Sequence, residues 1–442
     1  MNIIIIVMLI SSSCIKSIDT TIIYKNINDN LIIAAIEGKK DEVMDLLSKG
    51  ANVNYRNSNG FTALTYASRH GYTEVVRLLL ERGANINEKE INGYTALMLA
   101  SREGHIDVLK LLLEKGADVN DRSNEGWTSM MLALKNSYID VVKLLIQKGA
   151  NTYEKSNDGL TALMLISQKG HIEMMKSLIE REDDINDKDN KGHTALIYAS
   201  ENGHKEIVRI LIEKGADVND RSNRGWTALL FASQNGHMEI VNLLIENNAN
   251  INGANNYSWT PLMIASQNGH IDIVSLLIEK GANINNKETS GLTALMTACE
   301  NGYIDVVKLL LEKGANIHEK SKNKKNALMI ALKIESLGIV NLLIENNANI
   351  YEKDKYDRLF LVNLVKKLKT CNEKFKKDNL IDIAYLIIKK MTEDYIQLFV
   401  SLNKDENIEQ SFKDDIKNYI NLLRNLYNLP SELFISIVSF LV

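Results

Sequence analysis

Histidines and acidic residues recur at fixed intervals in this 442-residue chain, and such side chains can bind a metal ion or transfer protons. The histidines of the series are separated by 33 residues or by a multiple of 33: His105, His171, His204, His237 and His270. A zinc ion needs ligands that converge on one point, whereas these side chains lie on successive repeats of the sequence. We therefore expect structural turn residues here, and we predict neither a metal site nor a cofactor.

The acidic residues of the repeat do not form a catalytic pair. One of them opens the second half of each of eight units: Glu74, Asp107, Asp140, Glu173, Glu206, Glu239, Asp272 and Asp305. Negative charge is favourable at a helix N-terminus, so we interpret them as helix-start residues. The sequence contains no Gly-rich phosphate loop joined to a lysine, no His-Glu-x-x-His motif and no recognisable nucleophile elbow. The chain is predicted not to be an enzyme.

Composition narrows the class of protein further. The chain is 45% hydrophobic, which is ample material for a core, and its formal net charge of −4 gives no electrostatic reason to expect nucleic acid. The three cysteines, Cys14, Cys299 and Cys371, lie far apart in unrelated contexts and indicate neither a disulfide framework nor a zinc site. A monomer is the expected state.

Aromatic side chains recur at one position, immediately before a recurring threonine. Phe61, Tyr94, Trp127, Trp226 and Trp259 occupy it, and the other units carry Leu160, His193 and Leu292 there. A core position would carry a similar aliphatic residue in every unit, whereas this one varies in size and polarity. Exposed Trp and Tyr are common anchors of protein interfaces. We predict that this position binds a partner protein; packing of the rings between units is the alternative.

The elements that must position these side chains follow from the repeat itself. Thr-Ala-Leu or a close variant returns every 33 residues, at Thr62, Thr95, Thr128, Thr161, Thr194, Thr227, Thr260 and Thr293. After Thr227, a short apolar segment and a glycine precede Met238–Ile245, whose apolar residues have the spacing of one helical face. Helices this short are unstable alone, so each pair must stack on its neighbours to bury its apolar face. The sequence predicts an all-α solenoid of about ten helix-turn-helix units.

The repeat resembles that of the ankyrin family. The pattern G-x-T-A-L-x-x-A-S is followed by G-H-x-[DE]-[IV]-V-x-L-L-[IL]-E-x-G-A-[ND]-[VI]-N, and the resemblance covers residues 28–357. The family's Thr-Pro-Leu-His is here Thr-Ala-Leu and an apolar residue, with proline only at Pro261, which puts the usual hydrogen bond of that turn in question. The resemblance implies a non-enzymatic scaffold that binds a partner protein on a concave surface.

In the ankyrin family the residue before the threonine lies on that concave surface together with the residues before the turn glycine. We call the first the ring position and the residue seven places after the threonine the helix-end position. The resemblance implies a partner-binding set drawn from both: Phe61, Arg69, Tyr94, Arg102, Trp127, Lys135, Gln168, His193, Glu201, Trp226, Gln234, Trp259 and Gln267. The sequence does not identify the partner.

The 33-residue period is lost from about residue 358, and residues 358–428 are predicted to be a helical extension. Amphipathic spacing predicts helices over Leu359–Leu368 and Leu380–Met391, separated by the basic Lys374–Lys377 as a solvated loop. Further helices are predicted over Glu393–Leu402 and Asp414–Tyr427. The extension is thus expected to contain four separate helices.

Residues 429–442 resemble the start of an F-box, L-P-x-E-[IL]-x-x-x-I-[LV]-x-[FY]-L. The matching residues are Leu429, Pro430, Glu432, Leu433, Ile437, Val438, Phe440 and Leu441. In that family the segment recruits the linker protein of a cullin-type ubiquitin ligase, so the resemblance implies a substrate adaptor. Apolar residues four apart on a helix can insert into a partner groove. The alternative is a C-terminal capping helix with proline in its first turn.

Residues 1–27 form a hydrophobic N-terminal segment, and its first part, MNIIIIVMLISSSC, is similar to a secretory signal with a bacterial lipoprotein cleavage site. On this interpretation Cys14 is lipidated and the chain is an exported or membrane-anchored scaffold. The alternative is a strand or helix that packs on the first unit, because the apolar run is too short for an ordinary transmembrane helix. Lipidation and ligase docking exclude each other, and an intracellular location is the preferred expectation.

Overall fold

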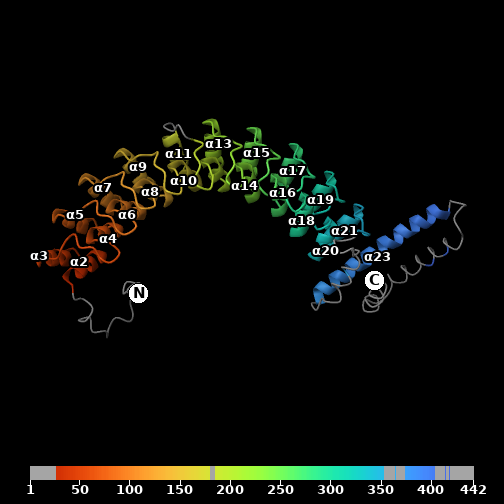
Figure 1. Ribbon diagram of the computed structural model, residues 1–442, viewed down its shortest axis with the longest axis horizontal. Coiled ribbons are helices and arrows are strands. Elements are labelled where there is room, and N and C mark those ends of the chain that lie inside the picture. The colour runs from red at the N-terminus through yellow and green to blue at the C-terminus, as the bar shows by residue number, and fades with distance from the viewer. Residues whose placement is uncertain are drawn as a thin grey trace. The chain divides into compact units, whose positions relative to one another are not determined.

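A computed structural model describes residues 26–179, 185–352, 364, 374–403, 414 and 418. The chain divides into two compact units, Met1–Asn190 and Lys191–Val442, each of which is described by itself. In the described part of each unit, short helices follow one another in pairs joined by tight turns (Figure 1). The predicted all-α solenoid of about ten helix-turn-helix units is confirmed.

The first unit contains five helix pairs within its described residues. They are α2 (Ile27–Ile36) with α3 (Lys40–Ser48), α4 (Ala63–Arg69) with α5 (Thr73–Glu81), α6 (Ala96–Glu103) with α7 (Ile106–Glu114), α8 (Ser129–Lys135) with α9 (Ile139–Gln147), and α10 (Ala162–Lys169) with α11 (Ile172–Ile179). The first helix of each pair packs on the first helices of its neighbours, from α2 through α4, α6 and α8 to α10. The continuous core of the unit therefore follows the first helices.

The second unit repeats this arrangement. Its pairs are α12 (Ala195–Glu201) with α13 (Lys205–Glu213), α14 (Ala228–Asn235) with α15 (Met238–Glu246), α16 (Pro261–Asn268) with α17 (Ile271–Glu279), α18 (Ala294–Asn301) with α19 (Ile304–Glu312), and α20 (Ala327–Lys333) with α21 (Leu337–Glu345). The first helices again contact one another from α12 to α20. A longer helix, α23 (Lys374–Asn403), packs on α21.

The recurring threonine caps the N-terminus of eight first helices, and Asn26 and Asn326 take its place in α2 and α20. In α6, for example, the hydroxyl oxygen of Thr95 accepts a hydrogen bond from the Met98 N–H at 3.3 Å, and Thr260 accepts one from Met263 in the same way. A side-chain cap of this kind satisfies an N–H that the helix itself leaves without a partner. The turn therefore keeps a side-chain hydrogen bond, although the family's histidine is replaced by a buried apolar residue such as Met98.

A small residue in the first helix permits the close stacking. An alanine five places after the residue that caps the first helix is 0% exposed in eight units: Ala67, Ala100, Ala133, Ala199, Ala232, Ala265, Ala298 and Ala331. The helix of Ala100, for example, packs on neighbouring first helices, α4 and α8, so there is no room for a longer side chain without repacking. Ile166 occupies the equivalent place in α10 and is also fully buried.

A contact between the turn glycine of one repeat and the histidine ring after the next turn glycine also connects consecutive repeats. Gly236 has a φ of +78°, and a Cβ added there would lie 2.8 Å from the ring of His270 in the next repeat. Glycine is required at this position both by its backbone conformation and by the contact with the ring.

The predicted break between helices in the extension is wrong. Lys374–Lys377 is not a loop but the start of α23, which continues without interruption through the segments predicted as Leu380–Met391 and Glu393–Leu402. Apolar residues at helical spacing, including Leu380, Ile383, Ala384, Ile387 and Ile388, are buried. The ion pair between Lys390 and Asp394 (3.1 Å) connects the two segments that were predicted to be separate helices. Lysine is a good helix former, and no glycine or proline interrupts the segment.

The helices predicted over Leu359–Leu368 and Asp414–Tyr427 lie almost entirely outside the described residues. None of the described helices has both the length and the apolar character needed to cross a membrane.

Candidate partner-binding surface

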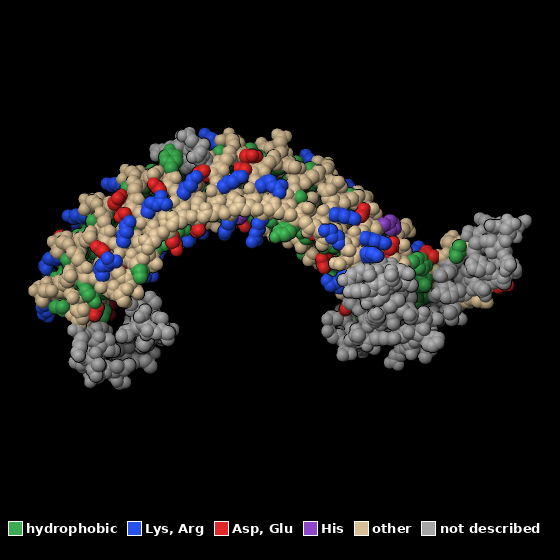
Figure 2. All heavy atoms as spheres, in the orientation of Figure 1, with side chains coloured by type: hydrophobic (Ala, Val, Ile, Leu, Met, Phe, Trp, Pro, Cys, Tyr) green, Lys and Arg blue, Asp and Glu red, His purple; other side chains and the backbone are tan. Residues whose placement is uncertain are grey.

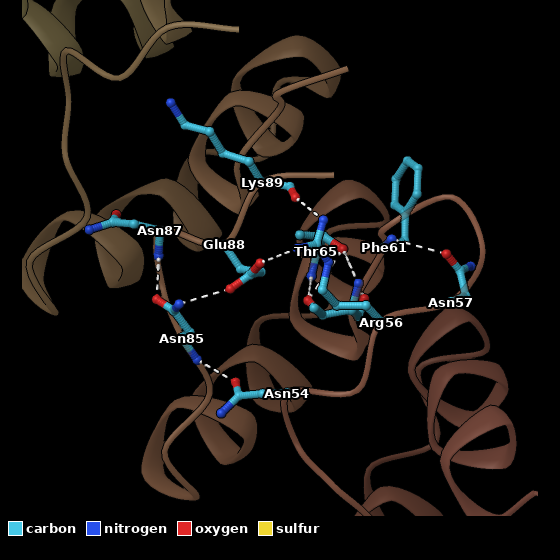
Figure 3. Close-up of polar contacts among 10 residues, drawn as sticks. Asn54, Arg56, Asn57, Phe61, Thr65, Asn85, Asn87, Glu88 and Lys89 are labelled. Carbon is cyan, nitrogen blue, oxygen red and sulfur yellow. Dashed lines mark hydrogen bonds and ion pairs between the residues drawn. The ribbon is translucent and has the colours of Figure 1, made fainter. Parts of the chain in front are cut away.

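The ring position lies at the end of a narrow loop that is held by two hydrogen bonds. The carbonyl of Trp127 accepts the Ser123 N–H at 2.9 Å, and the Trp127 N–H donates to the Ser123 hydroxyl at 3.1 Å. Phe61 makes the same pair of bonds with Asn57, shown in part in Figure 3, and Trp259 makes it with Asn255. The backbone that carries each ring is therefore fixed before any partner arrives.

The ring position differs in exposure from repeat to repeat. Trp127 is only 6% exposed, so it belongs to the core of the first unit. Seven other residues at this position are half-buried, with part of the side chain accessible to solvent: Phe61, Tyr94, Leu160, His193, Trp226, Trp259 and Leu292. An interface anchor needs both an accessible face and firm support, and the half-buried rings meet that requirement better than Trp127.

In the first unit the fold places ring and helix-end positions together. The guanidinium of Arg102 lies over the ring of Tyr94, 5.6 Å from its centroid, and the ammonium of Lys135 lies 4.6 Å from the centroid of the Trp127 ring. Both are cation–π arrangements. Glu103 adds an ion pair with Arg102 at 3.0 Å and lies 3.9 Å from Arg69. Gln168, at the last helix-end position of the unit, is exposed.

In the second unit the ring position belongs to an aromatic cluster. The ring centroids of Trp226 and Phe231 are 4.8 Å apart, and His193 makes edge contacts with Tyr198 at 5.4 Å and Phe231 at 5.6 Å. Here the helix-end residues of the partner-binding set carry no positive charge: Glu201 is half-buried, and Gln234 and Gln267 are exposed. The two units therefore present different chemistry at equivalent positions.

Sequence reasoning missed three aromatic residues of this surface. Tyr66, Tyr198 and Phe231 lie four residues after the threonine, and Tyr66 stacks on Phe61 at 4.7 Å. Other units carry Leu, Ile or Thr at this place, and the three aromatic side chains are half-buried while most of the aliphatic ones are buried. The exchange of an aliphatic for an aromatic residue at a fixed repeat position was the available signal.

Hydrogen bonds between the asparagine-rich loops of consecutive repeats form a frame. The Asn85 N–H donates to Asn54 Oδ1 at 2.7 Å (Figure 3). The pattern recurs in the following repeats at Asp118 with Asn87 and Asn151 with Asn120. Ion pairs reinforce the frame, and Figure 2 shows lysine and arginine side chains beside acidic ones at intervals along the repeats. Much of the asparagine in the sequence is therefore structural.

The histidines after the turn glycine are placed as turn residues that bridge repeats. Nε2 of His105 lies 3.0 Å from the Arg69 carbonyl oxygen, and His237 and His270 make the equivalent contact with Glu201 and Gln234. Within the described residues, no group of His, Cys, Asp or Glu side chains is arranged to hold a metal ion.

Burial shifts the pKa of one residue near this surface, His70, and of one residue in the core, Cys299. Burial, and then the nearby charge of Arg69, lowers the pKa of His70 below its usual value, so His70 is neutral at pH 7. Burial also raises the pKa of the Cys299 thiol, which keeps it protonated and unreactive in the core of α18.

The proposed lipidation residue Cys14 lies outside the described residues, as does the F-box-like segment with Leu429, Pro430, Glu432, Leu433, Ile437 and Leu441. Both remain predictions.

Comparison with known families gives a match over most of the chain. The family model described as ankyrin repeats (3 copies) matches residues 6–90, 87–156, 149–222, 216–288 and 282–354. No curated protein matches the chain.

Proposed function

The chain belongs to the ankyrin-repeat family, whose members are generally protein–protein interaction modules, and we propose that it is a non-enzymatic scaffold that binds a partner protein through its ring and helix-end positions. The observation that carries the proposal is the half-buried aromatic side chains that vary between repeats while their backbones are fixed in the same way. Large rings with one accessible face supply contact area at a small cost in side-chain entropy.

The mechanism of binding is preorganisation. Each ring is held by the loop hydrogen bonds and, in the second unit, by neighbouring rings such as Phe231 beside Trp226. Little conformational freedom remains to be lost when a partner binds, so more of the contact energy contributes to affinity. The cations over Tyr94 and Trp127 and the neutral residues beside Trp226 and Trp259 then determine which partner sequence fits.

Replacing Trp226 and Trp259 together with alanine tests this proposal. Peptides are first selected on the full chain from a displayed random library, and their affinities for the variants are measured by fluorescence anisotropy. We expect the double variant to bind the selected peptides at least about tenfold more weakly, because two supported anchors are lost. Circular dichroism should show that the helical content is retained.

Lys308→Ala is the matched control, because Lys308 is exposed on α19, away from both positions. It should leave the affinities unchanged. Selected peptides that bind the double variant and the wild type equally well would contradict the proposal, and loss of helical content in the double variant would show that the rings are structural.

A second candidate function rests on the F-box-like segment alone. We propose, as an alternative, that residues 429–441 recruit the linker protein of a cullin-type ubiquitin ligase while the repeats select a substrate. A purified linker protein should then bind the full chain and not a chain that lacks residues 429–442. Equal binding by both chains, or by neither, would remove this candidate.

A further inference from the structure

Ion pairs connect consecutive loops in a fixed register, and we call each of them a rung of the loop ladder. In the first unit, Arg56 pairs with Glu88 at 2.9 Å, Lys89 with Asp121 at 2.9 Å, and Lys155 with Asp187 at 2.6 Å. Further rungs of the ladder are Arg122–Glu154 in the first unit, and Lys287–Glu319 and Lys320–Glu352 in the second. The base always precedes its acid by 32 residues.

The second unit departs from this register at two consecutive rungs. Arg221 occupies a base position, but the residue 32 places later is Gly253 instead of an acid. Ala254 occupies the next base position, and Asn286 stands where its acid would be. The 33-residue spacing of the repeats is unchanged here. The loops therefore continue, but Gly253, Ala254 and Asn286 carry no charge at places where other repeats have ion-paired residues.

Arg221 is consequently exposed without a carboxylate partner among the described residues. Its guanidinium makes a 3.5 Å contact with the side-chain oxygen of Asn256. Arg122, at the equivalent place in the first unit, pairs with Glu154 and also donates to the Lys155 carbonyl oxygen at 2.7 Å. A guanidinium has five donors arranged to bind a carboxylate through two parallel hydrogen bonds, and most of those of Arg221 remain available.

An exposed aromatic residue follows Asn256, the residue whose side chain contacts this guanidinium. Tyr257 follows Asn256 at the tip of its loop and is 58% exposed. The same place in the other repeats is occupied by Asn59, Asn92, Glu125, Asp158, Lys191, Arg224, Ser290 and Asn323, all of them polar. The main chain of Arg224 accepts the Asn256 N–H at 3.1 Å, which places a second exposed arginine on the adjacent loop tip.

The backbone at this tip differs from that of most repeats, and Lys324, with a φ of +55°, shares the difference two repeats later. Ser258 has a φ of +63° at a place where Gly60, Gly93, Gly126 and Gly225 provide the same conformation without strain. A non-glycine residue in this region costs free energy and is more frequent at functional sites. Gly253 is buried and Ala254 is half-buried, and neither carries a charged group that could pair with the exposed Arg221 in place of a partner's carboxylate.

We propose that Arg221, Arg224 and Tyr257 form a second docking surface, on the loops of the second unit, for an extended acidic segment of a partner protein. A carboxylate of that segment takes the place of the missing acid at 253 and pairs with Arg221, and an apolar side chain beside it packs on Tyr257. The nearest acid of the ladder, Asp220, belongs to the preceding rung. The proposed surface lies at the tips of the loops whose ends carry Trp226 and Trp259, but it uses none of the residues of the ring and helix-end positions.

The test uses the full chain and two fluorescein-labelled peptides. One alternates Glu and Ser around a central Leu, and the other has Gln in place of every Glu. We expect the Glu peptide to bind at least about tenfold more tightly than the Gln peptide at low salt, and Arg221→Gln to remove most of this preference. Tyr257→Ala should weaken binding of the Glu peptide by about fivefold.

Restoring the missing acid gives the sharper experiment. Gly253 lies outside the left-handed region, and a Cβ there would be 3.0 Å from the Asn250 carbonyl oxygen, which would have to move by a few tenths of an ångström. The equivalent place holds an acidic residue in other repeats, as at Glu88 and Asp121. Gly253→Asp should therefore fold, supply Arg221 with an internal carboxylate and reduce binding of the Glu peptide as strongly as Arg221→Gln does. Arg122→Gln is the matched control, since its side chain is already paired, and it should leave peptide binding unchanged.

Several outcomes would overturn the proposal: equal binding of the two peptides, no binding of the Glu peptide, or a Gly253→Asp variant that folds and binds as the wild type does. Loss of peptide binding in the Trp226 and Trp259 double variant, with binding retained in Arg221→Gln, would place the acidic segment at the ring position instead. Thermal unfolding of every variant shows whether a loss of binding reflects a loss of folding.

Discussion

Replacing Trp127 with alanine should lower the free energy of unfolding of the first unit by about 3–5 kcal/mol, the range typical of large buried aromatic residues. The side chain is 6% exposed, and the Lys135 ammonium lies over its ring. Removing the ring leaves a cavity next to α8 and a cation without its aromatic partner. Equilibrium urea unfolding followed by circular dichroism measures the change.

Trp259→Ala is the matched comparison, because Trp259 occupies the ring position of another repeat but is half-buried. Its replacement should cost less, about 1–2 kcal/mol, and should act mainly on partner binding. An equal loss of stability in the two variants would show that exposure does not distinguish structural rings from binding rings. Trp127 is the one tryptophan of the first unit, so its fluorescence in the wild type also reports the unfolding of that unit.

The repeat architecture was predictable because every level of the sequence agrees with it. The 33-residue period fixes the helix pairs, Thr95 and its equivalents mark where first helices begin, and a turn glycine such as Gly236 marks where they end. The period ends before residue 374, and beyond it only the local spacing of apolar residues was available to predict helices. Local spacing located the buried residues of α23 but gave no reason to join Lys374–Lys377 to the segments that follow.

The candidate surface was predictable only in part, because exposure depends on neighbours that lie a whole repeat away. Position alone did not distinguish the buried Trp127 from the half-buried Trp226. The contribution of Phe231 becomes evident only when its ring is found beside His193 and Trp226, which belong to different loops. The missing acid at Gly253 was visible in the sequence, but its meaning required knowing that the equivalent residues are ion-paired.

In one repeat of the second unit, a buried carboxylate accepts the hydrogen bonds that hold the loop before the first helix. Glu288 is 7% exposed, and its carboxylate accepts the N–H groups of Ser290 and Leu292, each at 2.9 Å, together with the Ser290 hydroxyl. Burial on its own raises the pKa of Glu288, but the hydrogen bonds from Ser290 and Leu292 outweigh it and leave the pKa below its usual value. The ionised form is therefore the one that stabilises the fold.

Glu288→Ala should lower the free energy of unfolding of the second unit by about 2–3 kcal/mol at pH 7, because the Ser290 and Leu292 N–H groups lose a charged acceptor. Glu288→Asn should cost less than about 1 kcal/mol, since Asn57 and Asn255 accept the equivalent bonds in their own repeats.

The stabilisation by Glu288 should depend on pH. A lowered pKa contributes stability above the unfolded-state value of about 4.3, and that contribution is lost as the pH falls through the folded-state pKa. The difference between wild type and Glu288→Ala should therefore shrink in acid, which urea unfolding at pH 7 and below pH 4 measures directly. A difference that stays constant with pH would show that the carboxylate charge does not stabilise the loop.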